Sequence, residues 1–299
     1  MIKLVGDVML DWYDFCSLRD NPEHKTAPCY RVERSEYKPG GAGNVAANLK
    51  TLGANFEFLG VVGDDPFAVI LRKVLDEFGI SHNLLTEFGR ITTVKERTIL
   101  DGGVVSDDPY KGRKDRERIQ YLEEGSVDAI FKAVINGRKP EAIGVIDYRK
   151  GAVSESLVSR LKELEIPMFV DTKKEHYHFY KGVYLIKPNS KEVREMTGLE
   201  DELEAAEKLR DELGARVLLT RGKDGASFFG LDGERVDFPG HNVKQVDVTG
   251  AGDVVLATSL HFFVKGYDLM ESIRLANKAA SISVQHVGCY TVSEREILG

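Results

Sequence analysis

The sequence predicts an α/β fold in which helices cover both faces of a mostly parallel β-sheet and a small β lid is attached. First, apolar strand-like runs alternate with amphipathic helical patterns over most of the chain, which is typical of parallel sheets buried on both sides. Second, a glycine-rich turn near residue 250 leads directly into an apolar helix. Third, two charged β-like segments interrupt the alternation and predict the lid.

Composition indicates one ordinary soluble domain of 299 residues, with 42% hydrophobic and 30% charged residues. No repeat or linker divides the chain, so we expect a single domain over residues 1–299. The net charge of −7 argues against nucleic acid as a partner. Three scattered cysteines without C-x-x-C spacing fit a reducing compartment. Asp7 comes too early for a signal peptide and no apolar run has membrane-spanning length, so we expect a cytoplasmic protein without membrane contact.

The N-terminal part of the chain contains the predicted lid. Ile2–Val5 has the pattern of a short buried strand. Charged residues and prolines are followed by β-like alternation up to Tyr37, and Thr92–Leu100 is a second β-like run. We therefore place lid segments around residues 12–37 and 91–105. The elements expected between them are a helix that Gly53 ends, a strand followed by an acidic turn over Phe56–Asp65, and a helix from Pro66 to Phe78.

Strands and helices alternate through the rest of the chain, after a charged segment at Ser106–Arg118 that we expect to be a loop. Each apolar run either is short enough for a strand or has the periodicity of a helix. The expected elements are the strand Ala142–Ile146, the helix Ser154–Leu164, the strands Met168–Asp171 and Val183–Lys187, the helices Ser190–Met196 and Leu203–Leu213, the strands Val217–Thr220 and Ala226–Phe229, and the helices Val254–Val264 and Leu269–Val284.

The stretch from Asp247 to Asp253, D-V-T-G-A-G-D, is the strongest functional signal. A glycine turn leaves the first N–H groups of the following helix unpaired, at the positive end of the helix dipole. Gly250 and Gly252 let this backbone approach an oxyanion closely. Asp253 is then placed to accept a proton from a hydroxyl that attacks a phosphorus. For G-A-G-D alone, the alternative is an acidic residue that caps a helix after a glycine turn.

The complete heptad resembles the signature of the ribokinase-type (PfkB) family of ATP-dependent carbohydrate kinases. That resemblance implies a ribokinase-like three-layer α/β sandwich with a small β lid, and ATP-dependent phosphorylation of a sugar. In the family, the acid at the place of Asp253 is the catalytic base. The backbone of Gly250, Ala251 and Gly252 would neutralise charge on the transferred phosphoryl group. No Walker-type G-x-x-x-x-G-K-[ST] occurs, so a P-loop kinase is excluded.

The family also implies a sugar site near the N-terminus. Gly40, Gly41 and Asn44 match its G-G-x-x-x-N element, in which glycine backbone and the Asn side chain bind sugar hydroxyls. Asp11 matches a sugar-binding acid, and a carboxylate can accept hydrogen bonds from two vicinal hydroxyls. Asp7 is a weaker candidate because it also suits a turn. The alternative for Asn44 is a polar residue that starts a helix.

The same glycines contain G-x-G-x-x-A, formed by Gly41, Gly43 and Ala46, which is a pattern of dinucleotide-binding folds. That interpretation requires a strand immediately before the glycines. We do not expect Tyr37–Pro39 to be a strand, and we therefore reject it.

The resemblance implies a nucleotide site in the C-terminal half. Asn189 and Glu192 match an N-x-x-E element that acts through water and Mg²⁺ on the nucleotide phosphates, and hydrated Mg²⁺ suits such a pair. The alternative is a capping box, in which the two side chains only cap a helix. The further matches are Thr220, Gly222 and Gly225 of a T-x-G-x-x-G nucleotide loop, which alone would indicate only a hairpin turn, and Asn277 of the adenine pocket.

Two possible metal sites remain. Asp247 and Thr249, with backbone near Gly288, match the family's monovalent cation site, which implies K⁺. His176 and His178 invite a transition-metal interpretation, but their i, i+2 spacing and the lack of a third ligand argue against it.

Several stretches are similar to one branch, the heptose-7-phosphate kinases of lipopolysaccharide-core precursor (ADP-heptose) synthesis. That branch phosphorylates the anomeric hydroxyl of D-glycero-D-manno-heptose 7-phosphate to the 1,7-bisphosphate. The similar stretches are Gly6–Asp11, Pro39–Ala46, Thr92–Lys95, Asp147–Gly151 and Asp171–Lys173. A substrate phosphate needs basic partners, and the sequence does not rank Lys173, Lys150, Arg97 and Lys38 for this role.

Other functions stay open at this point. Cys16–Tyr30 and Leu100–Arg118 depart from that branch, so the substrate could be another sugar, a sugar phosphate or a nucleoside. A non-catalytic nucleotide- or sugar-binding regulator is the alternative outside enzymes, although the intact heptad argues against it. The absence of H-x-G-H predicts a kinase without a fused nucleotidyltransferase. An exposed edge strand of the lid would be protected by packing against a second chain, so we predict a homodimer.

Overall fold

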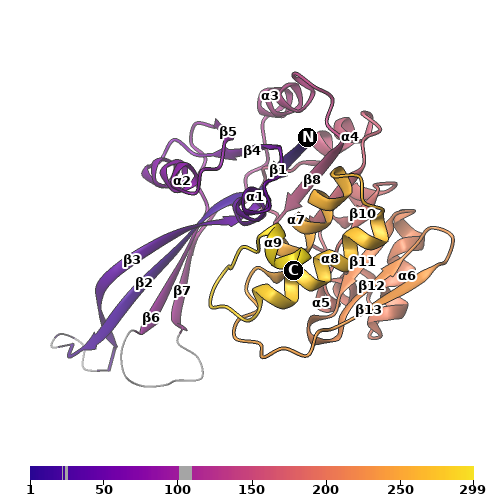
Figure 1. Ribbon diagram of the computed structural model, residues 1–299. Helices are drawn as coiled ribbons and strands as arrows, with labels where there is room; N and C mark the ends of the chain where they lie inside the picture. The colour runs from indigo at the N-terminus through magenta and orange to yellow at the C-terminus, as the bar shows by residue number, and fades with distance from the viewer. Residues whose placement is uncertain (22, 24–25, 101–109) are drawn as a thin grey trace.

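A computed structural model describes residues 1–21, 23, 26–100 and 110–299. Within these residues the strands form a nine-stranded sheet and a four-stranded sheet. Figure 1 shows the four-stranded sheet extending away from the layered body, in which helices flank the larger sheet.

The larger sheet is mostly parallel, as the alternating pattern predicted. Its order within the described residues is β13-β12-β11-β10-β9-β8-β1-β4-β5, and the strands from β5 to β11 pair in parallel. Strand β12 pairs in antiparallel with β11, and the edge strand β13 pairs in antiparallel with β12. The strands are β1 (Ile2–Gly6), β4 (Phe56–Val62), β5 (His82–Thr86), β8 (Ala142–Asp147), β9 (Met168–Thr172), β10 (Leu185–Ile186), β11 (Arg216–Thr220), β12 (Gly225–Phe229) and β13 (Arg235–Pro239).

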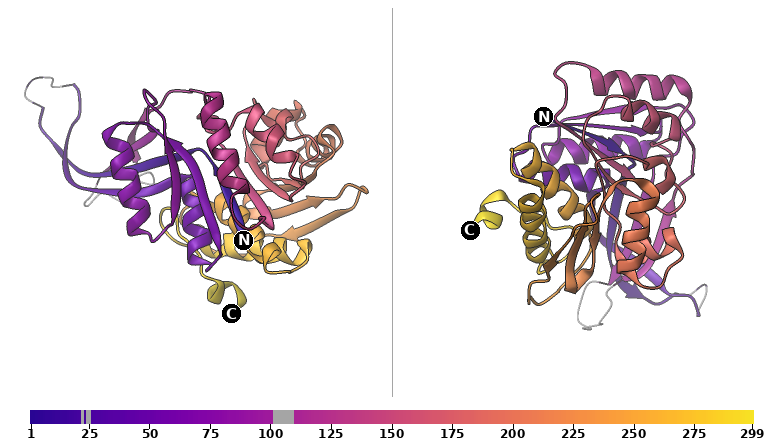
Figure 2. Two further views of the ribbon diagram at one scale, coloured as in Figure 1. Left: turned by 90° about the horizontal axis from the view of Figure 1, so that it is seen from above. Right: turned by 90° about the vertical axis from the view of Figure 1, so that its right-hand side faces the viewer.

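Helices cover both faces of this sheet, as Figure 2 shows from above and from the side. Strand β1 shows why, because Ile2 and Leu4 belong to one buried apolar cluster and Val5 to the other. The first cluster includes α1 (Ala42–Thr51), α2 (Pro66–Glu77), α7 (Ala251–Val264), α8 (Leu269–Ser283) and α9 (Glu294–Leu298). The second includes α3 (Glu124–Ile135), α4 (Glu155–Lys162), α5 (Ser190–Thr197) and α6 (Glu202–Leu213).

The smaller sheet corresponds to the predicted lid segments and extends beyond them. Within the described residues its order is β3-β2-β6-β7. Its strands are β2 (Val8–Arg19), β3 (Cys29–Gly41), β6 (Val94–Leu100) and β7 (Tyr110–Arg116). The residues 101–105 of the second predicted segment lie outside the described residues.

Two expectations about this region are wrong. The loop predicted at Ser106–Arg118 contains strand β7 over Tyr110–Arg116, and residues 106–109 lie outside the described residues. Strand β7 pairs with β6 but carries charges on both faces, so it lacks the alternation by which strands are recognised. Tyr37–Pro39 is part of β3. Because β3 is antiparallel to β2 in the lid sheet, it still does not form the parallel βαβ unit of a dinucleotide-binding fold.

Helix α3 and strands β5 and β13 were not expected from the sequence. Helix α3 begins without a capping side chain among the described residues, so it has no clear start signal. Strands β5 and β13 lie at the two edges of the larger sheet and have exposed positions. In the part of the chain that the structure describes, no helix has the length and apolar character needed to cross a membrane.

Candidate active site

The glycine turn before α7 creates an open helix N-terminus. Gly250 lies in the left-handed region with φ 79°, and α7 begins at Ala251 with no capping side chain among the described residues. A Cβ at Gly250 would lie 2.7 Å from Asn44 Nδ2, so a side chain would disturb this turn. The first N–H groups of α7 lie at the positive end of the helix dipole. This helix end is therefore suited to an anion.

Asp253 lies in the first turn of α7, and its side chain is buried. Its Oδ2 accepts a hydrogen bond from Asn44 Nδ2 (2.6 Å), and its Oδ1 accepts one from the Tyr148 hydroxyl (3.0 Å). Burial raises the pKa of Asp253 to about 6, and repulsion from Asp171 adds to the rise. The two hydrogen bonds and the nearby Lys187 limit it. The carboxylate is therefore mostly ionised at pH 7 but basic enough to accept a proton.

A buried ion pair adjoins the same helix end. Lys187, which follows β10, lies 2.9 Å from Asp171 on β9. Burial alone would lower the pKa of Lys187, but the charges of Asp171 and Glu192 outweigh burial and raise it. A Cβ at Gly252 would lie 3.2 Å from Lys187 Nζ, so the ammonium group is next to the glycine turn. A cation and a helix N-terminus thus face the same space.

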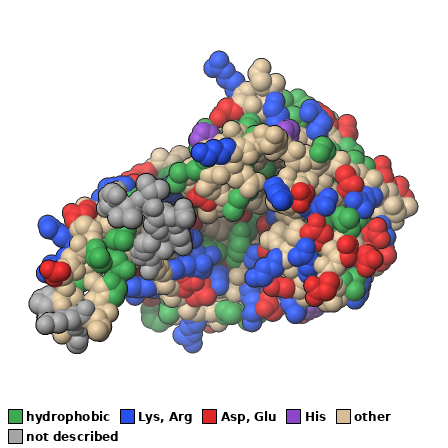
Figure 3. All heavy atoms as spheres, turned by 90° about the horizontal axis from the view of Figure 1, so that it is seen from below, with side chains coloured by type: hydrophobic (Ala, Val, Ile, Leu, Met, Phe, Trp, Pro, Cys, Tyr) green, Lys and Arg blue, Asp and Glu red, His purple; other side chains and the backbone are tan. Residues whose placement is uncertain are grey.

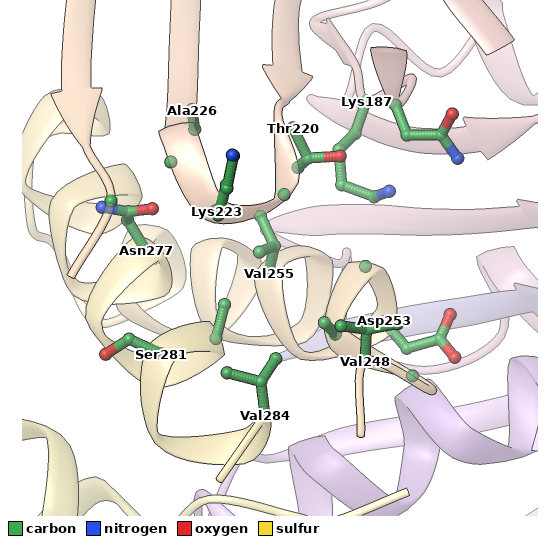
Figure 4. Close-up of a pocket in the computed structure, with 18 of the residues that line it drawn as sticks. Lys187, Thr220, Lys223, Ala226, Val248, Asp253, Val255, Asn277, Ser281 and Val284 are labelled. Atoms are coloured by element: carbon green, nitrogen blue, oxygen red, sulfur yellow. The ribbon is translucent and has the colours of Figure 1, made fainter. Parts of the chain in front are cut away.

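A cavity of about 350 Å³ opens beside this helix end, which is a usual size for a small-molecule site. Figure 4 shows how Thr220, Asn277 and Ser281 surround the space next to Asp253 and Lys187. The predicted site residues that line the cavity are Lys173, Asn189, Glu192, Thr220, Gly222, Gly225, Gly250, Ala251, Gly252, Asp253 and Asn277. The structure therefore gathers the predicted nucleotide residues and the glycine turn in one cavity.

Asn189 and Glu192 form the capping box of α5 that the sequence left as an alternative. Asn189 Oδ1 accepts the N–H of Glu192 (2.9 Å), and Glu192 Oε2 accepts the N–H of Asn189 (2.9 Å). Glu192 Oε1 also forms an ion pair with Lys173. Lys173 therefore lies in the same cavity as the predicted nucleotide residues, although we named it as a candidate for a substrate phosphate. Capping does not exclude a second role, because both capping residues line the cavity.

The predicted sugar-binding residues lie where the lid sheet joins α1. Gly40 and Gly41 end β3, and Asn44, in the first turn of α1, reaches Asp253. A Cβ at Gly40 would lie 2.7 Å from Asp11 Oδ2, so the glycine backbone lies directly against this carboxylate. Four residues that the sequence predicted for the sugar thus meet at the base of the lid.

The Asp7 carboxylate binds the loop after β8 and does not face these four predicted sugar-binding residues. Its carboxylate accepts the N–H groups of Lys150 (2.9 Å) and Ala152 (2.8 Å), and burial is the main cause that raises its pKa to about 6. The loop follows β8 and carries Tyr148, whose hydroxyl binds Asp253. The sequence analysis did not identify Tyr148 as a site residue, because this contact joins positions 105 residues apart.

Asp247, which precedes the glycine turn, forms hydrogen bonds with two segments of the chain. Its Oδ1 accepts hydrogen bonds from the N–H (2.9 Å) and hydroxyl (2.6 Å) of Thr249. Its Oδ2 accepts the N–H of Gly288 (2.9 Å). Burial would raise the pKa of Asp247, but these hydrogen bonds outweigh it and hold the pKa below its usual value. Asp247, Thr249 and the backbone of Gly288 are therefore adjacent, as the sequence predicted.

The His176–His178 pair is not arranged as a metal site. The Nδ1 atom of His176 lies 2.9 Å from Asp147 Oδ2, and its Nε2 atom lies 3.0 Å from the Tyr121 hydroxyl. Among the residues that the structure describes, no group of three or more His, Cys, Asp or Glu side chains is placed to hold a metal ion.

Fold and site together define a carbohydrate kinase. The chain belongs to the pfkB family of carbohydrate kinases, whose family model matches residues 1–296. The family resemblance inferred from the heptad is confirmed, and family membership implies ATP as the phosphoryl donor and a sugar as the acceptor.

Individual kinases and bifunctional proteins are similar to this chain over nearly its whole length. The chain is 36% identical to D-beta-D-heptose 7-phosphate kinase of Bordetella bronchiseptica, over 100% of this chain and 95% of that protein. It is 33% identical to the bifunctional protein HldE of Campylobacter curvus, over 99% of this chain but 64% of that protein. It is 34% identical to bifunctional protein HldE of Hydrogenovibrio crunogenus, and there it spans 62% of the relative's length.

Solved structures confirm the predicted fold class. Phosphofructokinase-2 from Escherichia coli, in complex with substrates and products, matches with a TM-score of 0.80 at 18% identity, over 100% of this chain and 97% of that chain. Ribokinase from Arabidopsis thaliana, complexed with ribose and ATP, matches with a TM-score of 0.73 at 18% identity, over 99% and 97% of the two chains. At this identity the likeness establishes the ribokinase-like architecture alone.

Proposed function

We propose that this chain transfers the γ-phosphoryl group of ATP to the anomeric hydroxyl of D-glycero-D-manno-heptose 7-phosphate and forms the 1,7-bisphosphate. The observation that carries the reaction type is the buried Asp253 carboxylate beside the open N-terminus of α7. The similarity to the heptose 7-phosphate kinase of Bordetella bronchiseptica, which extends over the whole chain, supports the choice of acceptor.

Asp253 is the proposed catalytic base. Its pKa of about 6 leaves it ionised at pH 7 to 8, so it can remove the proton of the attacking hydroxyl. Asn44 and Tyr148 hold its two oxygens in place. A base fixed in this way needs no rearrangement before it accepts the proton.

The glycine turn is the proposed anion hole for the transferred phosphoryl group. The backbone of Gly250, Ala251 and Gly252 lies at the positive end of α7, where the N–H of Ala251 also donates to the carbonyl of Val248 (3.2 Å), and Lys187 adds a full charge beside this turn. Phosphoryl transfer places negative charge on the equatorial oxygens of the transition state. Donors that are already oriented toward that charge stabilise it most.

ATP is proposed to bind in the cavity, with Thr220, Gly222 and Gly225 near the phosphates and ribose and Asn277 near the adenine. Mg²⁺ would be held through water by Asn189 and Glu192 and would neutralise phosphate charge. The donor set fits such an ion, because the amide of Asn189 and the carboxylate of Glu192 both line the cavity, and Mg²⁺ takes its other ligands from water and phosphates.

On the acceptor side we propose that Asp11, Gly40, Gly41 and Asn44 bind the sugar hydroxyls, within a single kinase domain whose lid sheet covers the sugar. We further propose a K⁺ ion near Asp247 and Thr249, where the carboxylate stays ionised. A cytoplasmic homodimer is proposed as well, since the edge strand β3 of the lid needs a cover. Light scattering and replacement of K⁺ by Na⁺ in the assay test the last two points.

The main test measures ADP release from Mg-ATP with heptose 7-phosphate, fructose 6-phosphate, ribose and nucleosides as acceptors. We expect turnover with heptose 7-phosphate and a loss of about 10²- to 10⁴-fold in kcat for Asp253→Asn. Asp232→Asn, an exposed residue in the turn between β12 and β13, is the control and should leave kcat unchanged.

Each result of this test has a clear meaning. Near-normal turnover by Asp253→Asn would exclude this residue as the base. Turnover with another acceptor alone would overturn the heptose assignment and keep the kinase. ATP binding without turnover of any acceptor would favour a binding protein.

A further inference from the structure

The loop that carries Tyr148 has an unusual backbone conformation. We call residues 148–152, which follow β8, the Tyr148 loop. Within the described residues, Arg149 is one of two non-glycine residues with positive φ (60°), and Gly151 has φ 95°. A side chain strains a backbone in this region, and such residues persist only where their surroundings fix them, often at functional sites. The contacts of this loop therefore show what holds it.

Two buried acids hold the backbone of the Tyr148 loop from inside the protein. Asp7 Oδ2 accepts the N–H of Lys150 (2.9 Å), and Asp7 Oδ1 accepts the N–H of Ala152 (2.8 Å). Asp147 Oδ1 accepts the N–H of Arg149 (3.0 Å). Strands β1 and β8 are parallel neighbours, so the acids at their carboxyl ends lie at the same edge of the sheet. Three N–H groups of one short loop thus depend on these two carboxylates.

Asp7 is placed for this contact and not for contact with a ligand. Its side chain is 1% exposed, whereas an acceptor would enter from the hollow between the lid and the layered body that Figure 3 shows. Burial raises the pKa of Asp7 to about 6 and repulsion from Asp147 adds to the rise, but the hydrogen bonds from the loop limit it. A carboxylate suits this position because both of its oxygens accept, whereas an Asn offers only one accepting oxygen.

A second segment of the chain holds the outer side of the Tyr148 loop. A Cβ at Gly151 would lie 2.0 Å from the carbonyl oxygen of Gln120, and Lys150 Nζ lies 2.7 Å from Glu117. The Arg90 guanidinium donates to the carbonyls of Gln120 (2.6 Å) and Lys150 (3.4 Å). The loop is therefore packed between Asp7 and the segment that joins β7 to α3.

The loop position determines a contact of the proposed base. The Tyr148 hydroxyl donates to Asp253 Oδ1 at 3.0 Å. A shift of the loop by about 1 Å would break this hydrogen bond, because such bonds are about 2.5–3.0 Å long. Burial raises the pKa of Asp253 and the Tyr148 hydrogen bond lowers it. A displaced loop would therefore leave a carboxylate that is less ionised near neutral pH and less firmly held.

We propose that Asp7 is a positioning residue for phosphoryl transfer, because it fixes the Tyr148 loop so that the Tyr148 hydroxyl reaches Asp253. This inference rests on the proposed function, in which Asp253 is the base, and it replaces the sugar contact that the sequence suggested for Asp7. Asp7 acts through the loop and not through its charge. Loss of a negative charge lowers the pKa of a neighbouring carboxyl, whereas loss of the Tyr148 hydrogen bond raises it. The two effects have opposite signs.

The test introduces Asp7→Asn into the wild type and into Tyr148→Phe. Asp7→Asn keeps the shape of the side chain and one accepting oxygen, so the chain should still fold. The pKa of Asp253 is read by carbon NMR of aspartate-labelled protein, with the signal assigned by its loss in Asp253→Asn. We expect Asp7→Asn to raise this pKa by up to about one unit and to move the acidic limb of the kcat profile with it. In Tyr148→Phe the same substitution should add little, because the affected hydroxyl is absent.

Gly151→Ala perturbs the same loop from its outer side without changing a charge. Its Cβ would meet the Gln120 carbonyl, so we expect the loop to move and the pKa of Asp253 to rise as in Asp7→Asn. Asp65→Asn is the matched control. The Asp65 carboxylate also accepts two backbone N–H groups, those of Ala68 (3.0 Å) and Thr92 (2.7 Å), at the start of α2. Its substitution should leave the pKa of Asp253 unchanged.

Two outcomes would overturn the role of Asp7. An unchanged or lowered pKa of Asp253 in Asp7→Asn would show that Asp7 does not hold the Tyr148 hydroxyl in place. An equal rise with and without that hydroxyl would show that Asp7 acts by another route. Wild-type turnover tests the proposed function separately, because the NMR titration requires no acceptor. If the wild type phosphorylates none of the acceptors, the kinase proposal fails, and the titration still decides whether Asp7 positions Tyr148.

Discussion

The nucleotide side and the acceptor side of Asp253 differ in how their cations are paired with acids. On the nucleotide side, Lys187 is paired with Asp171 and Lys173 with Glu192, whereas Lys223, which also lines the cavity, has no ion pair among the described residues. On the acceptor side, Arg97 and Arg113 lie opposite each other on β6 and β7, and Lys95 lies in register between Asp11 and Asp115 without forming an ion pair among the described residues.

The difference also extends to the type of structure that holds each side. The nucleotide side is built from strand ends and helix N-termini of the larger sheet, and the N-terminus of α7, which has no capping side chain among the described residues, suits an anion. The acceptor side is built from side chains on a separate four-stranded sheet, where the strand register decides which residues meet. Under the proposed function, phosphate binding would therefore depend on the backbone of the larger body, and acceptor choice on the side chains of the lid.

After Asp253→Asn, the largest effect is expected at the backbone of the proposed anion hole. Gly250→Ala should lower kcat by about 10²- to 10³-fold, the size of losing one oriented donor of an anion hole. The reason is that its Cβ would lie 2.7 Å from Asn44 Nδ2 and would move the turn. Steady-state kinetics with saturating ATP and sugar phosphate would measure the loss.

Gly182→Ala separates this effect from simple backbone strain. Gly182 has φ 76°, close to the 79° of Gly250, but a Cβ there meets nothing within 4 Å of the described structure. Both variants should lose about 1 kcal/mol of stability because of the positive φ. Only Gly250→Ala should lose activity. A normal kcat for that variant would mean that the backbone of the turn is not the anion site.

The second prediction concerns how much the buried Asp253 carboxylate lowers the free energy of unfolding. A carboxyl whose pKa is higher in the folded than in the unfolded chain destabilises the fold as pH rises between the two values. For Asp253 these are 3.8 and about 6. Asp253→Asn should therefore increase the free energy of unfolding at pH 8, by up to about 3 kcal/mol.

Urea unfolding at two pH values measures this cost. The gain from Asp253→Asn should be largest at pH 8 and about half as large at pH 5, where the folded wild type has already taken up a proton. A gain that does not depend on pH would contradict the assignment of the raised pKa to this carboxyl.

The nucleotide side could be predicted from sequence better than the acceptor side. The glycine turn, the Asn189 cap and the strand before Thr220 are local, so turn and capping chemistry marks them within a few residues. The lid strand β7 was missed because its partner β6 was needed to define it and because its charges conceal any alternation. Tyr148 and Lys95 show the same limit, because only the folded chain brings Tyr148 to Asp253 and Lys95 to Asp11.

The third prediction tests whether Tyr148 tunes the base. Tyr148→Phe removes a hydrogen bond that lowers the pKa of Asp253. Asn44, Lys187 and Asp171, which also face this carboxyl, are unchanged. The acidic limb of the kcat profile should move upward from about pH 6 by about one unit. At pH 6.5 kcat should fall several-fold, with little change in KM for ATP.

Tyr184→Phe is the control for this variant, because the Tyr184 ring packs against Phe169 and Phe263 away from the base. Its pH profile should match the wild type. If Tyr148→Phe lowers kcat equally at every pH, the hydroxyl does not act through the ionisation of Asp253.

The smallest effect separates the two roles of Asn189 on the nucleotide side. Asn189→Ala removes the cap of α5 and should cost about 1 kcal/mol of stability. Asn189→Ser keeps a capping oxygen and should cost less than about 0.5 kcal/mol. If the amide also holds hydrated Mg²⁺, both variants should raise the KM for Mg-ATP to a similar extent.

Asp201→Ala provides the comparison, because Asp201 caps the neighbouring helix α6 through the N–H groups of Leu203 and Glu204. It should lose as much stability as Asn189→Ala and keep a normal KM. A normal KM for Mg-ATP in Asn189→Ser would show that Asn189 acts only as a helix cap. The Mg²⁺ shell would then depend on Glu192 and the phosphates. A raised KM in Asn189→Ser with wild-type stability would show that one side chain both orders α5 and serves the nucleotide.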